Sequence, residues 1–450
     1  MPNDSSAFSY AHATLQQLAE DVLTHAKKQG ASACEVDVSE GFGQSVTVRC
    51  DEVETIEFNR DKGIGVTVYA GQRKGYASTS DFSPQALRDT VEAALKIARF
   101  TAEDDCAGLA EAALMARDCP ELDLHHPWAL TVEAAIEIAK RCEQAAFATS
   151  PLIENSEGAS VSTQQAHFVS ANSHGFMGGY PTSRHYVSCS VIAGEEDGEG
   201  MQRDDWYTTN RNPALLDAAE AVGRRAAERA TGRLGAQRIK TGEYPVLFDA
   251  TLAGGLLGSL VHAASGGALY RKASFLVGQL GQKILPDFVR IDERPHLRGA
   301  LGSAAFDSDG VATRERAVVE GGVLQGYFLS AYSARKLGMQ TTGNAGGAYN
   351  LLLQPGELDF SGLLKQMGRG LVVTELLGHG INYVTGDYSR GAAGFWVENG
   401  EIVHPVEEIT IAGNLRQMFA GIAAVGNDVL IRGSKQAGSI LIDRMTVAGA

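Results

Sequence analysis

Apolar and polar side chains alternate along residues 45–68, and this alternation constrains the fold more than any other feature of the sequence. Its apolar members are Val46, Val48, Cys50, Ile56, Phe58, Val66 and Val68. A period of two is typical of strands that bury one face, so the pattern predicts the strands of an antiparallel meander. Asn59, Asp61 and Gly63 interrupt the pattern and predict a turn between two of these strands.

Four segments with helical signals lie around the alternating stretch. Apolar residues from Leu15 to Ala26 recur every three or four positions and predict the first helix. Ser83-Pro84 and Thr131 begin two more helices, because serine and threonine cap helix N-termini and proline suits the first helical position. Asn212-Pro213 begins the fourth predicted helix for the same reason.

The two halves of the chain differ in character. Long alternating stretches and helical stripes fill the first half, whereas the second half is rich in glycine and in short apolar runs. Hairpins are predicted at residues 318–324 and 395–403, the latter with Asn399-Gly400 as its turn. We therefore expect an α+β protein. Its N-terminal α/β domain, residues 1–235, contains the meander, and its C-terminal β-rich domain, residues 236–450, has short strands and a few helices.

The charge balance limits the kind of partner that the chain can have. The 450 residues carry 39 basic and 54 acidic side chains, which gives a formal net charge of −15. Such a surface repels phosphate backbones and anionic lipids, so neither nucleic acid nor a membrane is expected as a partner. No apolar run reaches roughly 18 residues, and residues 1–10 lack the order of a signal peptide, so we expect a cytoplasmic protein.

The cysteines and the acidic run do not form metal or redox motifs. Six cysteines are present, at Cys34, Cys50, Cys106, Cys119, Cys142 and Cys189. No two of them make a Cys-x-x-Cys pair, so we expect reduced thiols. The acidic run at residues 194–200 lacks the spacing of a calcium loop and predicts a solvated turn.

The sequence also lacks the local motifs of several hydrolases. None of the 11 histidines is followed by glutamate, which excludes a local His-Glu-x-x-His zinc motif, and His125-His126 predicts a surface loop. Gly-x-Ser-x-Gly is absent, and the nearest imitation, His262 with Ser265, is better explained by helix packing. The glycines at residues 254–258 do not follow the spacing of a phosphate loop.

One segment in the second half is chemically dense. Residues 385–394 combine Asp387, Tyr388, Ser389 and Arg390 with several glycines, directly before a predicted hairpin. Two interpretations stay open at this point. The segment is either a loop whose polar side chains have no binding role and which is held by an internal Asp387–Arg390 pair, or a loop that lines a cleft.

Several long segments together resemble the PmbA/TldE family, and the resemblance covers nearly the whole chain. They are residues 59–76, 172–175, 332–338, 342–347, 370–376 and 394–415. The resemblance implies a subunit that pairs with TldD, a related zinc metalloprotease, in a cytosolic bacterial assembly. It implies that this assembly trims or degrades peptides, including a microcin leader peptide and an unfolded antitoxin. An older name of the family is modulator of DNA gyrase.

The resemblance also implies that the metal motif is degenerate here. In TldD the zinc is held by His-Glu-x-x-x-His on a helix and by a later cysteine. The matching positions of this chain hold Asp249, Ala250 and Gly254, the cysteine position falls near Gly391, and no cysteine follows Cys189. The resemblance therefore implies no cofactor on this chain, with zinc on the partner subunit.

Three functions stay open from the sequence. The first, which the resemblance favours, is the subunit without metal of a TldD/TldE metalloprotease complex that proteolyses peptides and unfolded proteins. The second is a binding protein that modulates the gyrase system without catalysis, and the third is a stand-alone hydrolase with an unrecognised nucleophile. Under the first, the isolated chain should be inactive and should form a homodimer. Residues 387–390 should then face the peptide channel or the partner.

Overall fold

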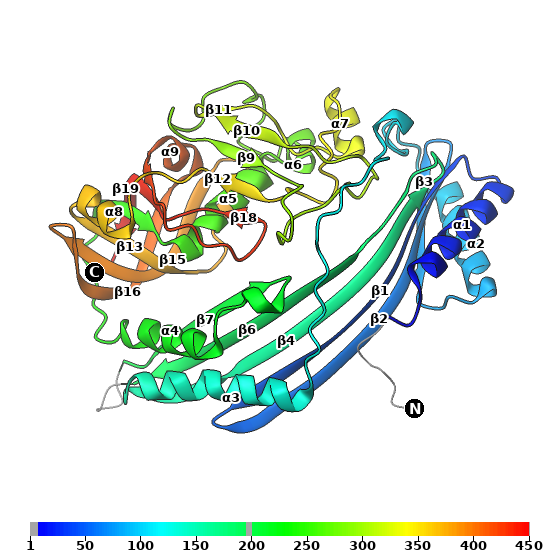
Figure 1. The fold of residues 1–450 in the computed structure, drawn as a ribbon. Coiled ribbons are helices and arrows are strands. Elements are labelled where there is room, and N and C mark those ends of the chain that lie inside the picture. Colours follow the sequence, from blue (N-terminus) through cyan, green and yellow to red (C-terminus); the bar gives the residue numbers. More distant parts are fainter. Residues whose placement is uncertain (1–7, 195–199, 450) are drawn as a thin grey trace.

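A long curved sheet and a group of two smaller sheets make up the molecule (Figure 1). The computed structural model describes residues 8–194 and 200–449, so most of the acidic run at residues 194–200 lies outside the described residues. The first sheet is built from residues 33–210, and the smaller sheets begin at Gly242. The combination of helices with largely antiparallel strands confirms the expected α+β class.

Seven strands form the first sheet, in the order β3-β2-β1-β4-β6-β7 with β5 beside β4. Their bounds are β1 Ala33–Arg49, β2 Glu52–Ala70, β3 Arg73–Thr79, β4 Ile153–Asn172, β5 Met177–Gly178, β6 Pro181–Ala193 and β7 Gln202–Asn210. All neighbours are antiparallel, and β1, β2 and β4 are 17, 19 and 20 residues long. The twist that accumulates over such long strands gives the curved shape seen in Figure 1.

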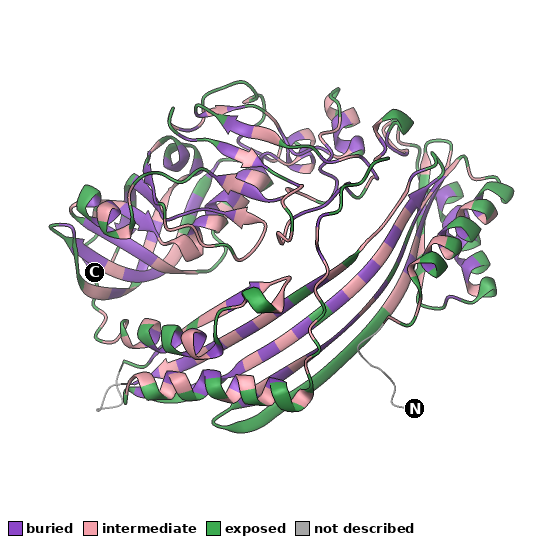
Figure 2. Cartoon of the chain, viewed as in Figure 1, coloured by how far each residue is buried: buried purple, intermediate pink, exposed green. Residues whose placement is uncertain are grey.

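The turn between β1 and β2 lies at Cys50-Asp51, so the turn predicted at residues 59–63 is wrong. Both turn residues have positive φ angles, of 51° and 65°. β2 continues through residues 59–63 in pairing with β1. Turn-forming residue types are accommodated inside this strand because β1 supplies hydrogen-bonding partners along the whole length. In consequence Ile56 and Phe58 lie on the exposed outer half of β2 (Figure 2).

Two pairs of helices cover the two ends of one face of the first sheet. They are α1 His12–Lys28 with α2 Pro84–Phe100, and α3 Val132–Thr149 with α4 Ala219–Thr231. Val36 and Val38 of β1 pack against the first pair, and Val46 and Val48 pack against the second. Alternate residues of a strand share a face, so these even-numbered positions place both pairs on the same face.

Three of the four predicted helices begin where the sequence indicates. The hydroxyls of Ser83 and Thr131 accept hydrogen bonds from backbone amides three residues further on, at 3.3 and 3.2 Å. The buried stripe of α1 includes Leu15 and Ala26 as expected. The fourth prediction is only partly right, because Asn212 caps a single 3-10 turn, η2 Pro213–Leu215, before α4. A similar turn, η1, spans Ala112–Leu114.

The strands after Gly242 form a closed five-stranded ring and a smaller sheet. The ring contains β8 Gly242–Phe248, β13 Gly370–Leu377, β15 Asp387–Glu398, β16 Glu401–Asn414 and β19 Ile440–Ala448, with β14 Ile381–Asn382 on β15 and β17 Ile422–Val425 on β19. β13 pairs with both β8 and β15, so each of the five strands has a neighbour on both sides.

The smaller sheet has the order β11-β10-β9-β12-β18. Its bounds are β9 Ile291–Glu293, β10 Arg316–Glu320, β11 Val323–Leu324, β12 Leu351–Leu353 and β18 Lys435–Gln436. The surrounding helices are α5 Ala250–Ala263, α6 Gly266–Tyr270, α7 Ala331–Leu337, α8 Phe360–Met367 and α9 Leu415–Ala420. Both predicted hairpins are confirmed, and Asn399 and Gly400 have the positive φ angles, 51° and 77°, that such a turn requires.

The stretch between α4 and β8 separates the first sheet from the later sheets. The domain boundary predicted between residues 235 and 236 lies in this stretch and stays a prediction. The six cysteines are free thiols, as expected. Across residues 8–194 and 200–449, no helix has the length and apolar character needed to cross a membrane.

Candidate functional site

The step from β8 into α5 is where the resemblance places the degenerate metal motif. The last three residues of β8 are buried, and Asp249 then caps α5. The Asp249 carboxylate accepts hydrogen bonds from the backbone amide of Thr251 at 2.9 Å and from its hydroxyl at 2.5 Å. This is the geometry of an ordinary N-cap, which satisfies an amide that has no partner inside the helix.

The residues at these positions do not fit a zinc ion. Zinc sites in proteins use three or four donors from His, Cys, Asp or Glu side chains. Ala250 has no donor atom and Gly254 has no side chain, while the Asp249 oxygen is engaged in the cap. Within the part of the chain that the structure describes, no group of three or more such side chains is placed to hold a metal. No chemical step through a metal on this chain is therefore derived.

A cavity of about 210 Å³ lies beside Asp249, between the two parts of the molecule. One wall comes from β7, α4 and the residues that follow it, and the other comes from the C-terminal part. The lining residues are Asp204, Arg225, Glu228, Arg229, Arg233, Asp249, Phe360, Val372, Thr374, Phe395 and Ile402. The first wall is charged and the second is mainly apolar, so the two walls differ in the ligand chemistry that they offer.

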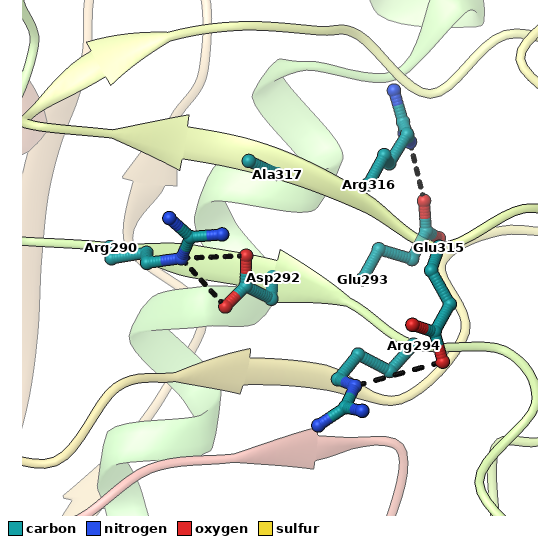
Figure 3. A pocket seen from close by; sticks show the side chains of 7 residues that line it. All are labelled: Arg290, Asp292, Glu293, Arg294, Glu315, Arg316 and Ala317. Carbon is teal, nitrogen blue, oxygen red and sulfur yellow. Dashed lines mark hydrogen bonds and ion pairs between the residues drawn. The ribbon is translucent and has the colours of Figure 1, made fainter.

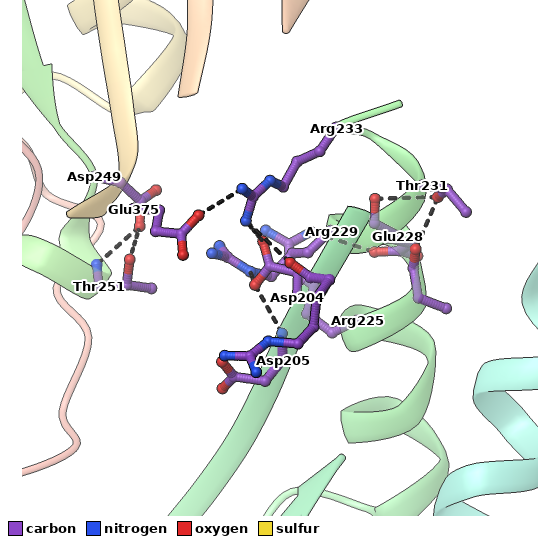
Figure 4. Close-up of polar contacts among 12 residues, drawn as sticks. Asp204, Asp205, Arg225, Glu228, Arg229, Thr231, Arg233, Asp249, Thr251 and Glu375 are labelled. Atoms are coloured by element: carbon purple, nitrogen blue, oxygen red, sulfur yellow. Dashed lines mark hydrogen bonds and ion pairs between the residues drawn. The ribbon is translucent and has the colours of Figure 1, made fainter. Parts of the chain in front are cut away.

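Ion pairs at this cavity join the two parts of the molecule (Figure 4). Arg229 lies 2.9 Å from Asp204, and Arg233 lies 3.6 Å from the same carboxylate. Arg233 also pairs with Glu375 on β13, across the junction. Because the charged wall is already neutralised by its own pairs, the network fastens β7 and α4 to the C-terminal ring rather than presenting free charge.

The segment that contains Asp387, Tyr388, Ser389 and Arg390 is the first part of β15, so the predicted loop is wrong. Asp387 and Ser389 are exposed, whereas Tyr388 is buried and Arg390 is half-buried. Side chains of a strand alternate between its two faces. The predicted Asp387–Arg390 pair is not formed, because residues three apart in a strand point to opposite faces.

Both charged side chains of this segment have other partners. The Asp387 carboxylate accepts hydrogen bonds from the Thr385 hydroxyl at 2.6 Å and the Asn414 amide at 3.1 Å, and these bonds hold the pKa of Asp387 below its usual value. Arg390 donates to the Leu376 carbonyl at 3.3 Å. The buried Nε of Arg390 has no hydrogen-bond acceptor among the described residues, which is a rare state for a buried donor.

The backbone of the same segment pairs with neighbouring strands on both sides. Tyr388 pairs with Ile381 of β14 on one side and with Gly413 of β16 on the other. A peptide needs an edge with unpaired N–H and C=O groups if it is to add as an extra strand. A peptide therefore cannot add as an extra strand at this segment. Contacts with a peptide are limited to exposed side chains such as Asp387 and Ser389.

The other residues singled out in the sequence have structural contacts. The Ser265 hydroxyl donates to the His262 carbonyl at 2.8 Å and caps α6. The His262 ring packs on the Tyr383 ring with 4.0 Å between centroids. These contacts agree with the expected role of both residues in helix packing, rather than with a pair of nucleophile and base. His125 lies on the first part of the molecule, where its ring forms a 2.9 Å hydrogen bond with Gln165.

A larger cavity, of about 830 Å³, lies where the first sheet meets α7 and was not predicted from the sequence. Its polar lining includes Glu35, Tyr69, Lys74, Glu103, Asp104, Asp105, Asp309, Tyr332 and Lys336. Lys336 lies 2.7 Å from Asp104, and Lys74 lies 3.8 Å from Glu35. Burial raises the pKa of Glu35 and of Asp309. These residues are far apart in the sequence, so no local pattern signals the cavity.

Asp307 lies two residues along the chain from a residue of this cavity wall. Its carboxyl group predicts that the stability of the protein depends on pH. Burial and the neighbouring Asp309 raise the pKa of Asp307 to about 7, although three backbone amides donate to its carboxylate. The folded state then keeps a proton that the unfolded state releases above about pH 4. The stabilisation from this proton is present at low pH and is lost as the pH rises from about 4 to about 7.

We expect Asp307 to lower the free energy of unfolding by about 2–3 kcal/mol between about pH 5 and about pH 8. Asp307→Asn should remove this part of the pH dependence, while Glu35 and Asp309 keep theirs. Urea unfolding of both proteins at the two pH values measures the difference. Equal pH dependence in the variant and the parent protein would contradict the assignment.

A groove of about 400 Å³ on the smaller sheet is lined by charged side chains that pair with one another (Figure 3). Arg290 reaches both oxygens of Asp292, at 2.9 and 3.0 Å. Arg316 lies 2.7 Å from the buried carboxylate of Glu293. The groove therefore presents paired charges that stiffen the sheet rather than a free binding group.

Comparisons with known proteins agree with this architecture. Models of the three domains of the PmbA/TldA metallopeptidases match the chain in order, with domain 1 at residues 34–98, the central domain at residues 125–234 and the C-terminal domain at residues 241–449. These three matches together cover most of the chain and are with domains of a metallopeptidase family. Over 427 residues the chain is 49% identical to metalloprotease PmbA of Escherichia coli O157:H7, which covers 95% of this chain and 94% of that protein. The chain belongs to the PmbA/TldD family, as the resemblance predicted.

Two solved structures share the fold. One is a Bacteroides thetaiotaomicron protein described as a candidate modulator of DNA gyrase, with a TM-score of 0.91, 28% identity, and coverage of 97% of this chain and 99% of that chain. The other is TldE from Thermococcus kodakarensis, with a TM-score of 0.82, 20% identity, and coverage of 96% and 100%. The second likeness concerns the fold alone.

Proposed function

We propose that this chain is the subunit without metal of a two-chain metallopeptidase, in which a related TldD-type chain carries the zinc. The observation that supports this most is the use of Asp249 as a helix cap, with Ala250 and Gly254 at the other two positions of the motif. The resemblance gives His-Glu-x-x-x-His to the TldD-type chain at these positions. Activation of the attacking water then belongs to the partner, and this chain carries no cofactor.

The proposed substrates are peptides and unfolded proteins of the cytosol. Hydrolysis by a metallopeptidase requires the scissile carbonyl to be held within bonding reach of the metal-bound water. A second subunit contributes by supplying another wall of the space in which the extended peptide lies. The exposed side chains of Asp387 and Ser389 are our candidates for contacts with the peptide or with the zinc-bearing chain.

The test is to mix the purified chain with its zinc-bearing relative and to follow cleavage of an unstructured fluorogenic peptide. We expect the mixture to cleave at least about tenfold faster than either chain alone, because the peptide is positioned only in the assembled complex. If this chain alone matches the mixture, it is itself a hydrolase. If the zinc-bearing chain alone matches the mixture, the subunit role is wrong.

Asp387→Asn should slow cleavage by the mixed complex about five- to tenfold, because it removes a charge that can hold a donor of the peptide while keeping the shape of the side chain. The change should leave assembly unaltered and lower the melting temperature only slightly, since Asp387 is exposed and only its bonds with Thr385 and Asn414 are affected. Cleavage assays and light scattering of the same samples measure both effects. Glu401→Ala, at another exposed carboxylate of the ring, is the matched control. Unchanged cleavage by a fully assembled Asp387→Asn complex would contradict the role.

The description of the Bacteroides thetaiotaomicron protein supports a second candidate function, which is modulation of DNA gyrase. The net charge of −15 disfavours direct contact with DNA, so this chain would act on a protein of the gyrase system. Gyrase supercoiling assays with and without the chain, in the absence of any peptidase partner, separate this candidate from the first.

A further inference from the structure

A cavity of about 360 Å³ lies on the first sheet, between the two pairs of helices. The helix pairs cover residues 36–38 and 46–48 of β1, and Figure 1 shows them toward opposite ends of the sheet. Phe42 and Gln44 lie between these covered positions and on the same face of the strand. The lining residues are Phe42, Gly43, Gln44, Phe58, Trp128, Ala129, Leu130, Thr131, Val132, Thr163 and Gln165.

Strand register brings the floor of this cavity together. Gln44 lies directly opposite Phe58 of β2 and Thr163 of β4, and Phe42 lies opposite Gln165 of β4. Residues opposite each other in antiparallel strands have Cβ atoms about 4.5–5.5 Å apart, so these side chains form one continuous floor. Residues 128–132, which lead into α3, supply the remaining wall.

The lining is aromatic and carries no charge. Phe42, Phe58 and Trp128 contribute three rings, and none of the described residues that line the cavity is charged. The Trp128 ring is held at right angles to the His185 ring, with 5.4 Å between centroids. Burying a charge without a partner costs much free energy, so this lining favours a neutral ligand with flat apolar faces. The volume falls in the range of small-molecule sites.

Gln44 offers a free acceptor to such a ligand. Its amide nitrogen donates to the Leu130 carbonyl at 2.8 Å. A carbonyl only accepts, so the nitrogen must face Leu130 and the oxygen Oε1 points elsewhere. Among the described residues this oxygen has no hydrogen-bond partner, yet it is not sealed from solvent.

Gln165 offers a free donor in the same way. Its amide oxygen lies 2.9 Å from Nε2 of His125, and its amide nitrogen has no partner among the described residues. The exposed fractions of Gln44 and Gln165 are only 9% and 6%. Two largely buried side chains thus each keep one polar atom unpaired beside an open cavity. A ligand that pairs with both atoms gains more than a purely apolar one.

We infer that this cavity binds a neutral, flat aromatic molecule of one or two fused rings, which donates a hydrogen bond to Gln44 and accepts one from Gln165. The faces of the ring pack against the aromatic side chains of the lining. The site uses neither the degenerate motif at Asp249 nor residues 387–390, and it therefore goes beyond the proposed function.

Calorimetric titration of the intact chain with carbostyril tests the site. This fused bicyclic lactam is neutral and carries an N–H donor beside a carbonyl acceptor. We expect a dissociation constant below about 1 mM, and at least about tenfold weaker binding of N-methylcarbostyril, which lacks the donor and leaves the Gln44 oxygen unpaired. Absence of saturable binding of carbostyril, or equal binding of the two compounds, would overturn the inference.

Two variants assign the binding to this cavity. Gln44→Met keeps the length of the side chain but removes the acceptor, so the preference for carbostyril over N-methylcarbostyril should fall to about one. A loosened wall would weaken both compounds and leave their ratio unchanged. Phe58→Ala removes an exposed ring and should weaken carbostyril at least about fivefold, whereas Phe100→Ala, at an exposed ring on α2, should not. Parent-like binding and preference in both cavity variants would overturn the inference.

The same titration of the chain mixed with its zinc-bearing relative separates a ligand site from a surface covered by the other subunit. We expect carbostyril to bind the mixed complex as it binds the single chain. Loss of binding in the complex would show that the other subunit occupies the cavity, and it would overturn the inference.

Discussion

Gly223→Ala should lower the free energy of unfolding by about 3 kcal/mol or more. Gly223 lies in α4 where this helix crosses α3, and a Cβ atom built on it would lie 1.9 Å from the carbonyl oxygen of Cys142. Both groups belong to helix backbones, so neither can move aside alone, and the two helices must separate. Denaturant unfolding followed by circular dichroism measures the loss.

The same substitution at Gly255 is the matched control. Gly255 lies inside α5, and a Cβ atom built on it meets nothing within 4 Å. Alanine there should stabilise the protein by about 0.5–1 kcal/mol, because glycine loses more backbone entropy in a helix. Opposite signs at the two glycines are the expected result. A stable Gly223→Ala variant would show that α3 and α4 do not cross as closely as described.

Asp204→Ala should cost about 3–5 kcal/mol, because it leaves two partly buried guanidinium groups without this partner. The exposed fractions are 8% for the side chain of Asp204, 16% for Arg229 and 12% for Arg233. Arg233 keeps Glu375, so the largest loss falls on Arg229. Unfolding in guanidinium chloride measures the cost, and limited proteolysis between α4 and β8 reports whether the two parts separate.

Glu220→Ala is the control for Asp204→Ala. Glu220 pairs with Arg141 at 3.5 Å, but both side chains are exposed, so its loss should change stability by less than about 1 kcal/mol. A similar, small effect of both substitutions would show that the Asp204 network does not fasten the two parts of the molecule.

The helices of the first half were predictable because their signals are local. Ser83 and Thr131 cap helices through bonds to amides three residues further on, and the apolar stripe of α1 repeats within a few turns. The Asn399-Gly400 hairpin was predictable for the same reason, since the turn itself requires positive φ angles. Each of these elements is specified by neighbours in the sequence.

The two wrong predictions concern segments whose conformation depends on distant partners. Residues 59–63 have the composition of a turn, yet β1 holds them in a strand. Residues 385–394 are also rich in glycine, yet most of them lie in β15 between strands of the ring. Glycine inside a strand permits close approach of another backbone, as at Gly394, where a Cβ atom would lie 1.8 Å from the Val372 carbonyl oxygen. Composition alone does not distinguish a strand that contains glycines of this kind from a loop.

The resemblance implies a degenerate motif at Asp249, but the surroundings of that position could not be predicted. The arginines beside it come from α4 and from the residues directly after it, and the carboxylates that pair with them come from β7 and β13. The junction is also fastened by Arg432, whose guanidinium lies 3.7 Å from the centroid of the Trp206 ring. Contacts between residues so far apart in the sequence leave no periodic signal in a single chain.

Zinc analysis of the purified chain tests the central claim most directly. The chain and its His-Glu-x-x-x-His relative are each incubated with zinc, freed of excess metal by gel filtration and measured by elemental analysis. We predict about one zinc per chain for the relative and no stoichiometric zinc for this chain, because its matching positions supply only the Asp249 cap. About one tightly bound zinc per chain of this protein would contradict the account.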